Sequence, residues 1–211
     1  MGFITHCWKS VLAETWRLLA WAVGAWLLAA SCAWAQNSML ELVELHAERR
    51  ETDLVLTAQL KLELGQSVED ALVKGLAVHF IAETEVMRNR WYWYDKKMVH
   101  RTRFYRLAFQ PLTRRWRLNV SNEPLSGAGL AGSIAQNFET LPEALDVIRR
   151  QSGWKVADTK DLDLDSRQYI VYKFSLDTSQ LPRPFQIATG NQTEWNLVVE
   201  RQLRLSKDMI R

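Results

Sequence analysis

Period-two alternation of apolar and polar side chains is the feature that most limits how this chain can fold. It is clearest over residues 54–64, where leucine or alanine occupies every second position. Similar stripes cover residues 76–82, 116–120, 170–176 and 195–205. A strand with this pattern buries one face and leaves the other in solvent. Such one-sided strands are typical of antiparallel sheets.

Two capping-box patterns predict short helices between the strands. They are Ser67 with Asp70, and Thr140 with Glu143. Gly75 and Gly153 are placed to end these helices. Residues 181–185 hold two prolines and predict an extended, polyproline-like connector.

The sequence therefore predicts a mainly β fold, an antiparallel two-sheet sandwich with two short helices. Neither helix is long enough to bridge parallel strands as a repeated unit. The alternative is an α+β fold in which both helices cover one face of an antiparallel sheet.

Residues 1–35 have the order of an export signal. Two cations, Lys9 and Arg17, precede an apolar run over residues 18–30. Ala33-Trp34-Ala35 then forms a small-x-small cleavage site. The run is shorter than the roughly 20 residues of a bilayer-spanning helix. We therefore expect a cleaved signal peptide, followed by a single periplasmic domain over residues 36–211.

Two alternatives for the leader stay open. It could remain uncleaved and anchor the domain in the inner membrane, facing the periplasm. Cys32 could instead be lipidated, although the residues before it depart from the usual lipoprotein pattern. The remaining cysteine, Cys7, also lies in the leader, so the mature part would contain no disulfide.

No catalytic, cofactor or metal motif stands out in the mature part. Residues 127–132 spell G-x-G-x-x-G, but no strand precedes the stretch and no helix follows it. The acidic run at residues 161–165 lacks the glycine and the final glutamate of a calcium loop. His79, Glu83 and Glu85 share one strand face, which closes poorly around a metal. We expect no catalytic residue, no cofactor and no metal.

The segment over residues 88–117 is the unusual part of the chain. It combines many arginines and lysines with a single acid, Asp95, and with interleaved aromatic residues. Arg115 and Arg117 are predicted to share the outward face of a strand. The candidate interaction surface consists of Arg90, Trp91, Trp93, Arg106, Arg115 and Arg117. Cations that merely protect a sheet edge are the structural alternative.

Several multi-residue motifs carry a family resemblance. They occur at residues 90–97, 105–107, 112–117, 138–145 and 181–186. Together they resemble the proteobacterial exported domain-of-unknown-function family four-three-nine-zero over nearly the whole mature chain. The resemblance implies an envelope location and a single domain, and it carries no assigned activity. Genes of this family often lie beside a membrane sensor kinase, which implies an envelope sensor as a partner.

The sequence thus predicts a non-enzymatic binding or interaction module of the cell envelope. The expected partner is an envelope protein, such as a membrane sensor kinase, or an anionic lipid or glycolipid. Export makes nucleic acid and nucleotides poor partners. A cell-wall or lipid hydrolase with dispersed catalytic residues is one alternative, and a structural accessory protein is another.

The leader gives a direct prediction. Because Ala35 ends the cleavage site, we expect the mature protein to begin at Gln36. Mass spectrometry of the intact protein from periplasmic and membrane fractions measures this. A membrane-bound chain that retains Met1 supports the uncleaved anchor, whereas an intact chain in the cytosol contradicts export.

Overall fold

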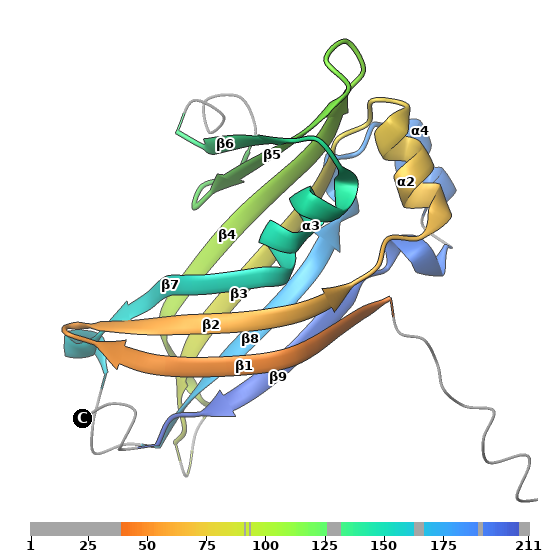
Figure 1. The fold of residues 1–211 in the computed structure, drawn as a ribbon. Coiled ribbons are helices and arrows are strands. Elements are labelled where there is room, and N and C mark those ends of the chain that lie inside the picture. The colour runs from red at the N-terminus through yellow and green to blue at the C-terminus, as the bar shows by residue number, and fades with distance from the viewer. Residues whose placement is uncertain are drawn as a thin grey trace, which may run out of the picture. The chain divides into compact units, whose positions relative to one another are not determined.

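The predicted mainly β fold with two antiparallel sheets is confirmed. The computed structural model describes residues 39–90, 92, 94–125, 132–162, 167–189 and 192–206. Within these ranges, nine strands form one six-stranded and one three-stranded sheet, and every strand pairing is antiparallel (Figure 1).

The six-stranded sheet has the order β6-β5-β4-β3-β8-β9. Its strands are β3 (Val78–Arg88), β4 (Lys96–Gln110), β5 (Arg115–Ser121), β6 (Ile134–Phe138), β8 (Gln168–Asp177) and β9 (Val198–Arg204). In β3 and β8, buried residues alternate with half-buried ones along almost the whole strand. This alternation gives the sheet an apolar inner face and a polar outer face.

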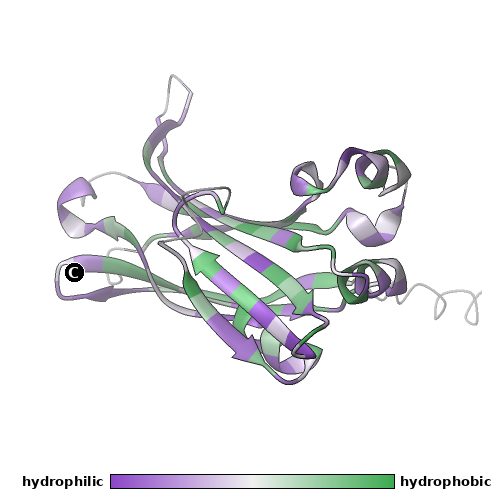
Figure 2. Cartoon of the chain, turned by 90° about the horizontal axis from the view of Figure 1, so that it is seen from above, coloured by the Kyte–Doolittle hydropathy of each residue, from purple (hydrophilic) through white to green (hydrophobic). Residues whose placement is uncertain are grey.

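The three-stranded sheet has the order β1-β2-β7. Its strands are β1 (Leu40–Arg50), β2 (Asp53–Leu62) and β7 (Arg150–Asp158). Figure 1 shows these strands running across those of the six-stranded sheet. In Figure 2 the colours for hydrophobic and hydrophilic residues alternate along the strands, as one-sided burial requires.

Aromatic rings of the six-stranded sheet occupy the core between the two sheets. Phe80 stacks on Phe174 with ring centroids 5.8 Å apart, and Tyr105 meets Phe174 edge-on at 6.4 Å. The Tyr172 hydroxyl donates a hydrogen bond of 3.1 Å to Gln151 on β7, and both residues are buried. This bond joins the two sheets and satisfies two polar groups inside the core.

The second predicted helix is α3 (Leu141–Arg149), and its N-terminal cap is confirmed. The Thr140 hydroxyl accepts a hydrogen bond from the backbone of Glu143 at 3.4 Å. The predicted C-terminal stop at Gly153 is wrong, because β7 begins directly at Arg150. Gly153 instead lies within β7 at a φ of 66°, beside a shift in the pairing of β7 with β2. Glycine at positive φ is typical of such a bulge.

The first predicted helix is α2 (Gln66–Val73), and Gly75 ends it at a φ of 87°. The predicted capping box of Ser67 with Asp70 is wrong, because the N-cap residue is Gly65, which has no side chain to form a cap. The backbone and hydroxyl of Ser67 donate to the Glu194 carboxylate instead. This contact links α2 to η4 (Thr193–Trp195), a short 3-10 helix where the sequence predicted the start of a strand.

The described structure contains one more α-helix, α4 (Arg183–Thr189), which the sequence did not predict. The expected extended connector over residues 181–185 is wrong, because α4 begins within it. The N–H groups of a first helical turn have no acceptor within the helix, so the N–H that proline lacks is not missed there. Pro184 is therefore compatible with a helix start. Among the described residues, no helix is both long and apolar enough to cross a membrane.

Several predicted features fall outside the described residues. They are the leader over residues 1–35, most of the glycine-rich stretch, Asp163 and Asp165, and the tryptophans Trp91 and Trp93.

Candidate functional site

The structure separates the predicted interaction residues along β4. Arg90 follows β3, and its backbone donates to Asp95 at 3.3 Å. Arg106, Arg115 and Arg117 lie toward the other end of β4, near its turn to β5. A strand of 15 residues spans about 46 Å at roughly 3.3 Å per step. Arg90 therefore does not share one contact surface with the other three arginines.

Arg106, Arg115 and Arg117 form a group on the outer face of the six-stranded sheet, which we call the arginine face. Arg117 lies opposite Ala108, two residues along β4 from Arg106, and on β5 it alternates with the buried Trp116 and Leu118. Within the described part of the chain, no carboxylate forms an ion pair with any of the three arginines. Burial and the charge of Arg117 both lower the pKa of Arg106.

His79 lies beside this group, between Arg106 on β4 and Asp177 on β8. Burial and the charge of Arg106 lower its pKa, while Asp177 acts in the opposite direction. Its Nδ1 atom is buried and has no hydrogen-bond partner among the residues described. The environment therefore favours the uncharged imidazole.

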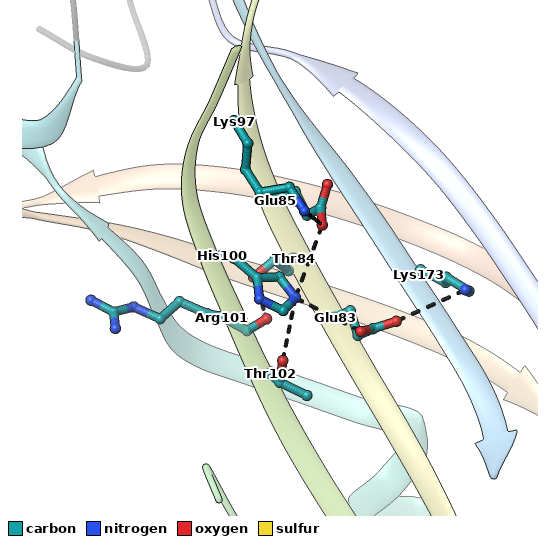
Figure 3. Close-up of polar contacts among 8 residues, drawn as sticks. All are labelled: Glu83, Thr84, Glu85, Lys97, His100, Arg101, Thr102 and Lys173. Atoms are coloured by element: carbon teal, nitrogen blue, oxygen red, sulfur yellow. Dashed lines mark hydrogen bonds and ion pairs between the residues drawn. The ribbon is translucent and has the colours of Figure 1, made fainter. Parts of the chain in front are cut away.

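Glu83 and Glu85 lie further along the same outer face, in a ladder of ion pairs (Figure 3). Glu85 contacts Lys97, and Glu83 lies 3.9 Å from Lys173. His100 lies 3.7 Å from Glu83 and 4.0 Å from Glu85. These side chains are partly exposed, so each pair contributes little to stability. The described residues contain no cluster of three or more ligands that could hold a metal.

A basic cleft lies between β4 and β7, and we call it the β4–β7 cleft. Its volume is about 650 Å³, and its walls include His100, Arg101, Thr102, Arg103, Trp154 and Lys155. The Arg103 guanidinium lies 4.8 Å from the centre of the Trp154 ring, a cation–π contact. An adjoining cavity of about 360 Å³ shares Arg103 and reaches Tyr105 and Gln151. The described residues that line the two spaces include no carboxylate.

The tyrosines beside the cleft stay protonated at neutral pH. Burial raises the pKa of Tyr105 to about 12, although Arg103 acts in the opposite direction. Burial also raises the pKa of Tyr172. The cleft and the adjoining cavity together thus combine cations with the neutral Tyr105 hydroxyl and with amide groups, a set that suits an anionic ligand.

Sequence reasoning missed the β4–β7 cleft because it did not predict β7. Trp154 and Val156 are buried on either side of the exposed Lys155, which is a short period-two signal. The glycine bulge interrupts this pattern between Gln151 and Trp154. Arg101 and Arg103 were included only as members of the basic segment.

The fold and these surfaces define a small antiparallel β protein with a cationic cleft and a patch of three arginines on its outer face. Comparison with protein families adds one match, to the family described as Domain of unknown function (DUF4390), over residues 37–204. The match covers most of the sequence, so the chain belongs to this family, as its motifs indicated. No curated protein matches the chain, and no solved structure matches it.

The environment of His79 predicts a pH dependence of stability. Because the pKa of His79 is lowered in the folded state, the unfolded chain takes up a proton more readily than the fold does. The fold therefore has its full stability above the ordinary histidine pKa of 6.5 and loses part of it as the pH falls below that value. We therefore expect the free energy of unfolding to fall less steeply in His79→Gln than in the wild type between about pH 7 and pH 5. Denaturant titrations at several pH values measure this slope.

His46→Gln, at an exposed position on β1, measures the effect of losing a histidine outside this cluster. NMR titration of the His79 ring protons gives an independent reading. A ring that titrates above the ordinary histidine range would contradict the assigned environment.

Proposed function

We propose that this chain is an exported envelope protein that acts as a non-enzymatic binding module. Its partner is anionic and is contacted through the basic segment over residues 88–117. The leader-like residues 1–35 support the location. Membership of a family of unknown function leaves the activity open.

The arginine face is the observation that carries this proposal. Three guanidinium groups with no carboxylate partner among the described residues lie on neighbouring strands of one rigid sheet. On the same outer face, Glu83 and Glu85 already have cationic partners, and Asp177 accepts hydrogen bonds from the backbone and hydroxyl of Ser179. Excess positive charge at a fixed position attracts and orients an anionic partner.

The expected partners are an acidic surface of an envelope protein, such as a membrane sensor kinase, or an anionic lipid or glycolipid. Arginine suits all of these, because its planar guanidinium binds carboxylate and phosphate groups in a bidentate way. Nucleic acid and nucleotides are not expected in the proposed compartment.

The hydrolase alternative gains little support from the cleft. His100 lines it, but its nearest carboxylate contacts, Glu83 and Glu85, are not among the described lining residues. A histidine base and a carboxylate that converge on one pocket would have favoured hydrolysis.

Charge reversal on the arginine face tests the proposal. Because Arg115 and Arg117 are exposed, the double variant Arg115→Glu/Arg117→Glu is expected to fold and to lose most of its partner contact. Crosslinking in intact cells, followed by mass spectrometry of the captured molecules, measures the loss. We expect recovery of a captured envelope partner to fall at least about tenfold.

The matched control is Arg201→Glu/Arg204→Glu, which changes the net charge equally at exposed positions of β9. This control is expected to capture the same partner as the wild type. Unchanged capture by the Arg115→Glu/Arg117→Glu variant would remove the arginine face as a contact surface.

A further inference from the structure

Half of β4 has an open edge within the described structure. β5 pairs with β4 only from Phe104 to Gln110, whereas β4 continues to Lys96. Over residues 96–103, the only described strand that pairs with β4 is β3. Open strand edges bind extended chains readily, because their peptide groups are already aligned for pairing.

The direction of the peptide groups identifies which of them face the open side. The Arg101 carbonyl accepts a hydrogen bond of 3.4 Å from Thr84 on β3, so it points toward β3. Peptide groups of successive residues in a strand point to opposite sides. The N–H and C=O groups of His100 and Thr102 therefore point away from β3, and both residues line the β4–β7 cleft.

The opposite wall of the cleft is a second strand edge. β7 is the last strand of the three-stranded sheet, and Gly153, Trp154 and Lys155 line the cleft from its side. Gly153 has no side chain to fill the space. A cleft of about 650 Å³ between two edges leaves room for a short stretch of extended chain.

The positive charges on the inner side of β4 favour acidic side chains on an extended chain bound in the cleft. Figure 3 shows Arg101 extending away from the side of β4 that carries His100 and Thr102. Arg101 and Arg103 form no ion pair with a described carboxylate, whereas Lys155 is already bound by Asp53 and Asp158. An added strand would place every second side chain beside Arg101 and Arg103.

We propose that the β4–β7 cleft binds an extended acidic segment of a partner protein by strand addition to β4. The inference rests on the proposed function and names the chemical class of its partner. The peptide groups of His100 and Thr102 pair with the backbone of the segment, and Arg101 and Arg103 pair with its carboxylates. A lipid headgroup would satisfy the arginines but not the two peptide groups.

A synthetic peptide of alternating glutamate and valine, with both ends capped, tests strand addition to the full-length chain. Isothermal titration calorimetry measures its affinity. One control peptide carries N-methyl groups on alternate amides, and another has lysine in place of glutamate. We expect both controls to bind at least about tenfold more weakly, because each removes one of the two required interactions.

Variants of the protein test the assigned wall. Arg101 is exposed, so Arg101→Glu is expected to fold and to weaken binding of the acidic peptide at least about tenfold. Arg204→Glu, on the distant strand β9, makes the same charge change and is expected to bind like the wild type. Equal affinity of the N-methylated and unmodified peptides would overturn strand addition, as would full affinity of Arg101→Glu.

Vesicles of phosphatidylglycerol separate this inference from the proposed function. If vesicles bind in a manner that depends on Arg115 and Arg117 while the acidic peptide does not bind, the strand-addition inference is wrong and the proposed function stands. If the peptide binds through β4 but reversal of the arginine face changes no contact in cells, the assignment of the arginine face as a contact surface is wrong and the strand-addition inference stands. If the peptide does not bind and reversal of the arginine face changes no contact in cells, both proposals are wrong.

Discussion

Strand β4 has 15 residues and its neighbour β5 has seven, and this difference in length leaves about half of β4 paired on one side only within the described structure. Where the two strands pair, β4 is enclosed on both sides and carries the buried Tyr105 and Leu107. Over residues 96–103, which β5 does not reach, the described residues leave one side of β4 open toward β7. The alternation of a strand divides the cations of this region between an outer face and a cleft.

The core tolerates this opening because other contacts hold the two sheets together. The stacked rings of Phe80 and Phe174 fill the interior, and Tyr172 binds Gln151 across the sheets. Arg103 lies over Trp154 where β4 approaches β7. A buried aromatic core, with Tyr172 and Gln151 hydrogen-bonded to each other, keeps both walls of the cleft fixed, which a preformed site requires.

Local patterns predicted most strands, because burial of one strand face makes apolar and polar residues alternate along the sequence. The Thr140 cap was also predictable, since its partner Glu143 lies within the same turn. β7 was missed because the bulge at Gly153 breaks its alternation. The cleft could not be predicted either, because Trp154 approaches Arg103 only through the packing of two sheets, and no local pattern records that contact.

Amide hydrogen exchange of β4 tests the central claim most directly, because it reports which peptide groups are paired. If the edge is open, the amides of His100 and Thr102 exchange much faster than those of Arg101 and Arg103, which point toward β3. Leu107, on the same strand and enclosed by both neighbours, provides the protected reference. Equal protection of all four amides over residues 100–103 would show that this edge is already occupied and would contradict the account.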